Sequence, residues 1–180
     1  MKSKFLSKLS LLIGLILLID AFYIQAKAHV AQWLIEYSWE VSRGNDTAEK
    51  PWPWFDTQVS AKMTINDYPP LFVLAESSGQ SLAFAPAFER QTNSATKVIS
   101  AHRNTHFSLL KESKVGDRLT LEGIEGKVQR YRLVSYSIYD ARKEFLLSSD
   151  PSKLLLFTCY PFDDLTTTSP LRFVAEFELI

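Results

Sequence analysis

The 180-residue sequence has very little cysteine and no surplus of either charge. Its one cysteine, Cys159, cannot form an intrachain disulfide, and a lone thiol on an exported protein is open to oxidation unless it has a use. Twenty basic residues balance twenty acidic ones, and no cluster of lysine and arginine is interleaved with aromatic residues. The sequence therefore lacks the electrostatic footprint of nucleic-acid binding, and we expect no nucleic-acid partner.

Charged residues are also scarce in one long segment near the N-terminus. The stretch from Phe5 to Ile24 is long enough to cross the hydrocarbon core of a membrane, with Lys8 and Asp20 near its two ends. The lysines at the start of the chain predict a cytoplasmic N-terminus. A cleaved signal peptide is the alternative, because Ala26-Lys27-Ala28 has the form of a cleavage site. We therefore assign residues 1–28 to a membrane anchor or a signal peptide.

The segment 29–50 is predicted to be an amphipathic helix followed by a linker. Apolar residues recur at helical spacing along it, at Val30, Trp33, Leu34, Tyr37 and Val41, and Arg43-Gly44-Asn45-Asp46 ends the pattern. The helix can continue directly from the apolar segment. We interpret its Trp and Tyr residues as packing against the folded domain or lying among the lipid headgroups.

The folded domain is predicted to span residues 51–180, after the stiff connector Pro51-Trp52-Pro53-Trp54. Short runs rich in β-branched and aromatic residues alternate there with turn residues, and no βαβ rhythm is present. We predict eight strands, at Val59–Ile65, Leu71–Ala75, Leu82–Ala85, Val98–Ala101, Arg118–Glu122, Val128–Tyr139, Leu154–Cys159 and Arg172–Leu179. The pattern predicts an all-β barrel or barrel-like sandwich of antiparallel strands, with a short helical turn at Phe107–Lys114.

Cys159 lies at the end of an apolar strand that Pro161 stops. In the last predicted strand, alternation places Phe173 and Ala175 on one face and Arg172 on the other. If the two strands are antiparallel neighbours, Cys159 and Arg172 come within reach of each other's side chains. A guanidinium close to a sulfur favours the thiolate and can donate to an oxyanion.

A general base is the missing partner, and histidines are few. His102 follows the strand Val98–Ala101 at a junction with a loop, where functional side chains are often displayed, and His106 is the nearby rival. Non-catalytic roles compete on these patterns alone. Cys159 could be a small buried residue, Arg172 a solvated side chain paired with a glutamate, and His102 a cap on a backbone group. Spacing by itself makes catalysis the minority interpretation.

Three short motifs change that balance. Leu155-Leu156-Phe157-Thr158-Cys159 resembles the signature Thr-Leu-x-Thr-Cys of the sortase family, Ala101-His102-Arg103 resembles its Gly-His-Arg, and Leu171-Arg172-Phe173-Val174 resembles the segment that carries its arginine. The motifs occur in the family's order. The resemblance runs from about Trp52 to the C-terminus. With Trp52-Pro53-Trp54 and the N-terminal anchor, the sequence is similar to the sortases of Gram-negative marine proteobacteria.

The resemblance implies a closed sortase-like barrel and a cysteine transpeptidase. Its catalytic residues would be Cys159, His102 and Arg172, and Thr158, Ala101 and Arg103 would bind substrate. The enzyme would cut a Leu-Pro-x-Thr-Gly-like sorting signal at the C-terminus of a protein substrate, between Thr and Gly. A Cys159 thioester would then pass the acyl group to an amine. We expect no cofactor and no metal. The chain would be a single-pass protein of the inner membrane with its catalytic domain in the periplasm.

The sequence departs from the family pattern at three places. Leu155 replaces a threonine, Ala101 replaces the glycine before the histidine, and Ala85-Pro86-Ala87 resembles a Gly-Pro-Gly turn without its glycines. Glycine matters mainly where φ is positive, so these changes bear on loop conformation. Two other functions stay open: a hydrolase using the same Cys-His pair, and a tethered barrel that binds a ligand in an aromatic cleft. The aromatic residues available for such a cleft are Phe84, Phe88, Tyr136 and Tyr139.

Overall fold

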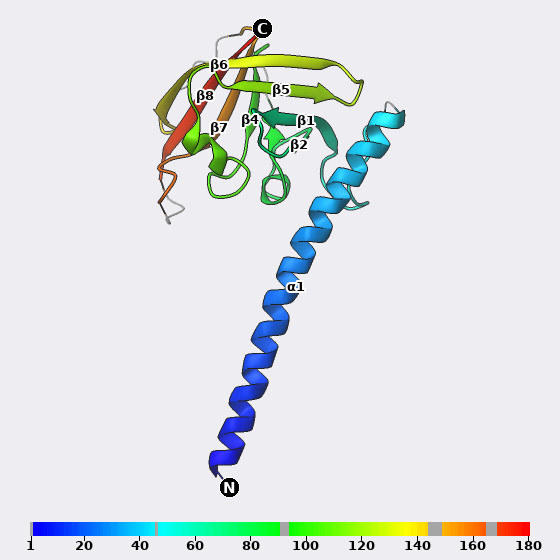
Figure 1. Ribbon diagram of the computed structural model, residues 1–180, viewed down its shortest axis with the longest axis vertical. Coiled ribbons are helices and arrows are strands. Elements are labelled where there is room, and N and C mark those ends of the chain that lie inside the picture. Colours follow the sequence, from blue (N-terminus) through cyan, green and yellow to red (C-terminus); the bar gives the residue numbers. More distant parts are fainter. Residues whose placement is uncertain (1, 46, 91–93, 144–148, 165–168) are drawn as a thin grey trace.

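The computed structural model describes residues 2–45, 47–90, 94–143, 149–164 and 169–180. A single long helix, α1 (Lys2–Asn45), leads into a closed β-barrel and extends far away from it (Figure 1). The helix is unbroken because its sequence contains no proline. Among the described residues it is the one helix long and apolar enough to cross a membrane, as an anchor or a signal sequence would be. The predicted barrel preceded by an N-terminal helix is confirmed.

Eight strands close the barrel in the order β1-β2-β3-β4-β7-β8-β6-β5, and β5 pairs again with β1. They are β1 (Val59–Ile65), β2 (Leu71–Leu74), β3 (Ala87–Phe88), β4 (Lys97–Ser100), β5 (Arg118–Gly123), β6 (Val128–Asp140), β7 (Lys153–Cys159) and β8 (Leu171–Leu179). The β2–β3 and β4–β7 pairs are parallel and the others antiparallel. The barrel is therefore mixed, which the sequence pattern did not indicate because side chains alternate with period two in either case.

The strand predicted at Leu82–Ala85 is wrong. A short 3-10 helix, η1 (Ser81–Ala83), occupies the first half of this segment, and β3 starts only at Ala87. The apolar residues of the segment are needed in a core beneath α1, and that requirement produced a strand-like run of hydrophobic residues. The helical turn predicted before β5 is confirmed as η2 (Ser108–Glu112). Gly116, in the turn that follows, has a φ of 102°, a value that suits glycine.

The main core fills the inside of the barrel. Alternate residues of each strand point inward, among them Met63, Ile99, Leu156 and Phe177, all fully buried. The residues between them point outward. This alternation decides which side chains of β4, β7 and β8 belong to the core and which are displayed on the outer surface.

A second core joins α1 to the barrel. Ile35 and Trp39 of the helix pack against Phe55, Val59, Leu74, Ala85 and Ala87, and Ala31 on the same helix face is also buried. The amide Nε2 of Gln32 also donates to the Phe84 carbonyl at 2.7 Å. The stripe predicted to pack against the domain is different, because Val30, Trp33 and Tyr37 are all more than half exposed. The packing alternative is therefore wrong for Trp33 and Tyr37.

Candidate active site

Cys159 and Arg172 are direct neighbours across the β7–β8 ladder. Cys159, the last residue of β7, pairs with Arg172 near the start of β8. Paired residues in an antiparallel ladder have Cα atoms about 4.5–5.5 Å apart and side chains on the same face. That face is the outer one, because the flanking Thr158 and Phe173 are buried and Phe173 belongs to the barrel core. The predicted cross-strand pairing of Cys159 and Arg172 is thus present in the fold.

His102 reaches the same level from the other side of β7. Strand β4 runs parallel to β7, with Ser100 opposite Phe157. Two residues further along each chain come His102 and Cys159. His102 is exposed and follows the buried Ala101, so alternation assigns it to the outer face as well. His102, Cys159 and Arg172 therefore occupy one row, with Arg172 near the start of β8, Cys159 at the end of β7 and His102 two residues after the end of β4.

Hydrogen bonds hold the ends of β4 and β7 together. The hydroxyl of Thr158 donates to the Ala101 carbonyl at 2.8 Å, and the Ala101 amide donates to the Phe157 carbonyl at 3.2 Å. Both Thr158 and Ala101 are buried and face the interior. A substrate contact of either residue stays a prediction, and their evident effect is to fix the register of His102 against Cys159.

The alanines that replace family glycines occupy ordinary backbone conformations. Among the described residues, Asn66 is the one non-glycine residue with a positive φ, at 45°. Ala101, Ala85 and Ala87 therefore adopt conformations open to any L-amino acid. The three departures do not force a strained backbone at these positions.

The Arg172 side chain is anchored to its own strand. Its Nη1 donates to the carbonyls of Ser169 and Leu171, at 2.9 Å each. Its Nε and Nη2 make no hydrogen bond to a described residue. One edge of the guanidinium is thus fixed while donors remain that could face an oxyanion.

The chain between β7 and β8 is tied to neighbouring loops. Nη2 of Arg103 donates to the Asp164 carbonyl, Lys111 pairs with Asp163 at 2.7 Å, and the Ser169 hydroxyl donates to the Tyr160 carbonyl. Residues 165–168 of this chain segment lie outside the described part. The substrate-binding role of Arg103 stays a prediction, and its observed contact links the loop after β4 to the loop after β7.

His106, the rival base, lies in a different environment from His102. It is half-buried, and its burial lowers the pKa of the imidazole below the ordinary 6.5. The neighbouring His102 lowers the pKa of His106 further, and a hydrogen bond with the Phe84 backbone acts in the opposite direction. The backbone contact ties His106 to the packed segment below α1, and His102 is the histidine that lies level with Cys159.

A small apolar cluster lies beneath the row on the outer face. Val98, Leu155 and Val174 are its buried members, and Tyr139 and Phe157 pack against them. Tyr139 of β6 is also the cross-strand partner of Arg172. Residue spacing did not predict Tyr139 beside Arg172, because a bulge between Leu133 and Ser135 shifts the β6 register. Adjacent strands thus carry Tyr139, Arg172, Cys159 and His102 in that order.

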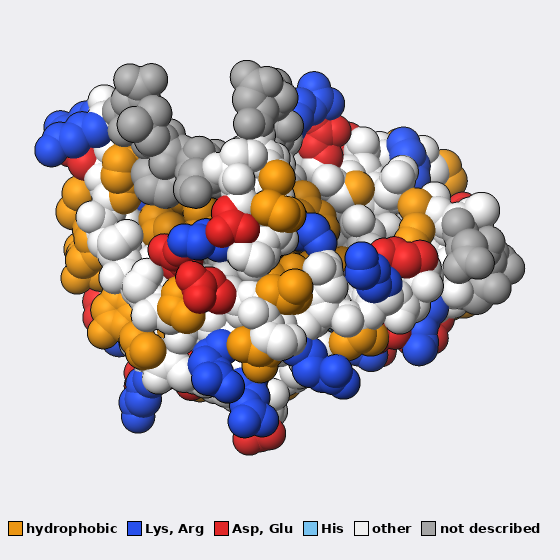
Figure 2. Space-filling view, turned by 90° about the horizontal axis from the view of Figure 1, so that it is seen from above, with side chains coloured by type: hydrophobic (Ala, Val, Ile, Leu, Met, Phe, Trp, Pro, Cys, Tyr) orange, Lys and Arg blue, Asp and Glu red, His pale blue; other side chains and the backbone are white. Residues whose placement is uncertain are grey.

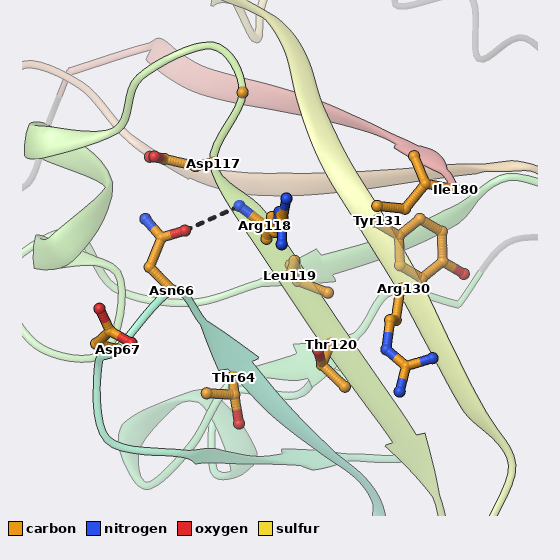
Figure 3. Close-up of a pocket in the computed structure, with 11 residues that line it drawn as sticks. Thr64, Asn66, Asp67, Asp117, Arg118, Leu119, Thr120, Arg130, Tyr131 and Ile180 are labelled. Carbon is orange, nitrogen blue, oxygen red and sulfur yellow. Dashed lines mark hydrogen bonds between the residues drawn. The ribbon is translucent and has the colours of Figure 1, made fainter.

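Two cavities of the barrel do not include the row itself, although one of them is lined by Tyr160 and Phe173, the chain neighbours of Cys159 and Arg172. One of about 630 Å³ lies at the barrel end where Arg118, Arg130 and Ile180 come together (Figure 3). This cavity is far from the row, because Leu179, the neighbour of Ile180, lies seven residues along β8 from Arg172, or about 23 Å at roughly 3.3 Å per residue. A second cavity of about 420 Å³ is lined by Tyr136, Tyr160 and Phe173. Neither includes Cys159 or His102 among its lining residues.

The aromatic residues considered for a ligand cleft do not share one. Phe84 packs in the core beneath α1, Phe88 against the barrel core and Tyr139 on the outer cluster, while Tyr136 is exposed. On the face seen in Figure 2, lysine and arginine side chains are interspersed with carboxylates and apolar groups, without a field of one sign. The four residues therefore do not form the predicted cleft, although Tyr136 lines the smaller cavity together with Tyr160 and Phe173.

The row combines the groups needed for acyl transfer. A half-buried thiol can act as nucleophile, an exposed imidazole can carry a proton, and a guanidinium can stabilise negative charge on oxygen. All three come from the ends of rigid strands. The arrangement therefore has the components of a covalent mechanism at a peptide bond.

Comparison with known proteins gives the same indication. The model of the sortase domain matches residues 63–180. Among solved structures, sortase A from Corynebacterium diphtheriae is 15% identical, with a TM-score of 0.59 over 84% of this chain and 83% of that one. Sortase C1 from Streptococcus agalactiae is 19% identical, with a TM-score of 0.56, and the match covers 67% of this chain and 66% of that one. Sortase C-1 from Actinomyces oris is 17% identical, with a TM-score of 0.56 over 67% and 73%.

No curated protein sequence matches the chain. The similar structures show the fold of this chain, and their sequence identities are too low to show a shared role. The domain match spans most of the barrel and all three motif segments. The chain therefore belongs to the sortase family of cysteine transpeptidases.

Proposed function

We propose that the chain is a transpeptidase whose nucleophile is Cys159, with His102 as acid and base and Arg172 as the oxyanion donor. The observation that supports the proposal most is the cross-strand register: Cys159 pairs with Arg172, and Ser100 pairs with Phe157, two residues before His102 and Cys159. A buried or scattered set would not serve chemistry on a bound peptide. Membership of the sortase family supports the same reaction class.

In the first half-reaction, the Cys159 sulfur, as a thiolate beside a protonated His102, bonds to the carbonyl carbon of the scissile peptide bond. The carbonyl electrons move to oxygen, where the free donors of Arg172 stabilise the charge. Collapse of this intermediate breaks the C–N bond, and His102 gives its proton to the departing amine. The acyl group is then held as a thioester, which divides one difficult transfer into two easier steps.

In the second half-reaction, an amine attacks the thioester carbon and His102 takes its proton. The C–S bond breaks and the sulfur leaves as thiolate, so the original protonation state returns. Water in place of the amine would give hydrolysis through the same residues. The two outcomes differ in the acceptor alone.

The substrate we propose is a protein with a Leu-Pro-x-Thr-Gly-like C-terminal sorting signal, cut between Thr and Gly. The resemblance of the motifs around His102, Cys159 and Arg172 supports this choice. The apolar α1 supports anchoring in the inner membrane, with the N-terminus in the cytoplasm and the barrel in the periplasm. The Trp52-Pro53-Trp54 segment supports assignment to the Gram-negative group of the family.

The decisive experiment is capture of the thioester with a Leu-Pro-x-Thr-Gly peptide. The wild-type chain should form an adduct that hydroxylamine releases, and Cys159→Ala should form none. His102→Ala and Arg172→Ala should lower the rate of adduct formation by about two orders of magnitude or more, because each removes a group acting in the transition state. His106→Ala is the matched control and should retain adduct formation.

Cleavage of the peptide by Cys159→Ala would refute the mechanism. Thermal unfolding of each variant, monitored by circular dichroism, separates loss of chemistry from loss of fold. Addition of a small amine during turnover tests the acceptor: a transpeptidase diverts product to the amide, and a hydrolase releases the free acid at an unchanged rate.

A further inference from the structure

Helix α1 has a second apolar face that the barrel does not cover. Between residues 25 and 42, the exposed large hydrophobic side chains are Val30, Trp33 and Tyr37, and Trp33 stacks on Tyr37 with ring centroids 5.7 Å apart. Residues 33 and 35 are about 200° apart around a helix at roughly 100° per residue. Trp33 thus points away from Ile35 and from the barrel on which Ile35 packs.

The uncovered face has a regular period. Counting towards the N-terminus from Tyr37, apolar residues recur at alternating steps of four and three. The series, here named the seam, is Leu12, Ile16, Ile19, Tyr23, Ala26, Val30, Trp33 and Tyr37. Its seven large side chains are 53% to 63% exposed. Alternation of four and three over several heptads is the pattern of a two-stranded coiled coil.

Within the apolar segment this spacing does not distinguish one face of the helix, because every face of a membrane helix is apolar. Beyond it the period is informative. The exposed positions around the seam are occupied by polar residues, namely Gln25, Lys27, Gln32, Glu36 and Glu40. The large exposed hydrophobic side chains of this part of the helix all belong to the seam. A helix face that meets only water would not need a regular row of large hydrophobic side chains.

Lipid does not account for the outer part of the seam. Tyr37 is thirteen residues beyond Ile24, which is about 20 Å along a helix at roughly 1.5 Å per residue. The headgroup region on each side of a bilayer is about 5–8 Å thick. Even if the span is extended to Ala28, Tyr37 lies about 14 Å beyond its end. Tyr37 therefore extends past the zone where aromatic residues anchor to a membrane, and Trp33, about 7.5 Å beyond Ala28, lies at the outer limit of that zone.

A second copy of the chain fits the seam. Copies inserted in one membrane share one orientation, so identical positions of two helices face each other in a parallel pair. Ala26, with Phe22 and Tyr23 beside it, lines a shallow hollow that can accept a side chain from a facing helix. Complete burial of an aromatic side chain covers roughly 150–250 Å², and Tyr23, Trp33 and Tyr37 are each more than half exposed. With the aliphatic members, the seam offers much of the roughly 800 Å² per partner of a stable interface.

We propose that α1 forms a parallel homodimer through the seam, with each barrel docked on the outer side of its own helix. The helix thereby has two apolar faces with different partners: the Ile35 face binds its own barrel, and the seam binds the second chain. This dimer does not depend on the chemistry at Cys159.

Disulfide scanning of the full-length chain in membrane vesicles tests the dimer. Cys159→Ala removes the native thiol, and single cysteines are then introduced by Val30→Cys, Trp33→Cys and Tyr37→Cys. Gln25→Cys and Gln32→Cys are the controls, since both lie on the helix away from the seam. Mild oxidation should give a band of twice the chain mass for the seam positions, at least about fivefold stronger than for the controls. Equal crosslinking at both sets, or none at either, would overturn the proposal.

A second variant separates pairing from folding. Tyr37→Glu, added to the Val30→Cys chain, should lower crosslinking roughly tenfold because two like charges would face each other across the seam. Tyr37 is exposed, so unfolding of the barrel should not change. Gln25→Glu is the matched control and should leave crosslinking intact. If Tyr37→Glu retains the crosslink with the barrel folded, the seam is not the interface.

Discussion

Thr158 places the reacting residues although its own side chain faces away from them. Its hydroxyl donates to the Ala101 carbonyl inside the barrel, one residue before Cys159 on β7 and one before His102 after β4. We expect Thr158→Val to lower the free energy of unfolding by about 1–3 kcal/mol, because a buried carbonyl loses its hydrogen bond. Thioester formation should also slow, since the two strand ends lose a fixed register. Urea unfolding and the rate of peptide capture measure the two effects.

Thr158→Ser is the control for this substitution. It keeps the hydroxyl and removes one methyl group, so stability should fall by less than in Thr158→Val and peptide capture should remain close to wild type. Equal rates of peptide capture for Thr158→Val and wild type would mean that other contacts fix the register of His102 and Cys159.

His106 gives the fold a sensitivity to acid. Burial lowers the pKa of its imidazole below 6.5, so the unfolded chain binds more protons than the folded chain as the pH falls through this range. The associated stability is complete above pH 6.5 and is lost as the pH decreases. We expect His106→Gln to show a smaller drop in melting temperature between pH 7.5 and pH 5.5 than the wild type. The exposed His29, changed to Gln, is the control and should leave the drop unchanged.

At the level of single residues, the sequence was informative where one pattern decides the position. Pro161 marked the end of β7, and alternation assigned Arg172 to the face opposite Phe173, so their proximity followed from antiparallel pairing. The partners of Arg172 were not predictable. Its bonds to the Ser169 and Leu171 carbonyls depend on a side-chain rotamer, and its neighbour Tyr139 depends on a bulge in β6.

At the level of elements, hydrophobic runs predicted seven of the eight strands close to their observed positions. The exception was the two-residue strand Ala87–Phe88, whose apolar neighbours serve the core beneath α1. The hydrophobic pattern also could not predict which strands pair in parallel. The parallel β4–β7 pair matters most, because it is the reason that His102 and Cys159 leave their strands at the same end of the barrel.

The spacing of apolar residues also did not predict which face of α1 packs against the barrel. Its apolar residues were evident from spacing, and Trp33 and Tyr37 were interpreted as packing against the domain or lying among lipid headgroups. The observed docking face instead contains Ile35 and Trp39. Apolar residues occur on two sides of this helix, and spacing alone does not say which side meets the barrel. The contacts with β1 and β2 are needed to decide.

At the scale of the whole molecule, the barrel and the outer part of α1 form one packed unit. Ile35 and Trp39 are fully buried in the core that Phe55 and Val59 share. Burial of two such side chains contributes about 3–6 kcal/mol by area transfer. The helix is thus a structural part of the barrel domain as well as its connection to the apolar segment.

Two truncations test this coupling. A chain starting at residue 29 removes the apolar segment and keeps the docking face, so its free energy of unfolding should match that of the full chain. A chain starting at residue 51 should be less stable by about 3–6 kcal/mol, because Val59, Leu74 and Phe55 lose their cover. Denaturant unfolding of both chains gives the difference. If the chain from residue 51 is as stable as the full chain, the helix rests on the barrel without stabilising it. If the chain from residue 29 is as stable as the full chain and the chain from residue 51 is not, the domain needs the docking face and not the segment before residue 29.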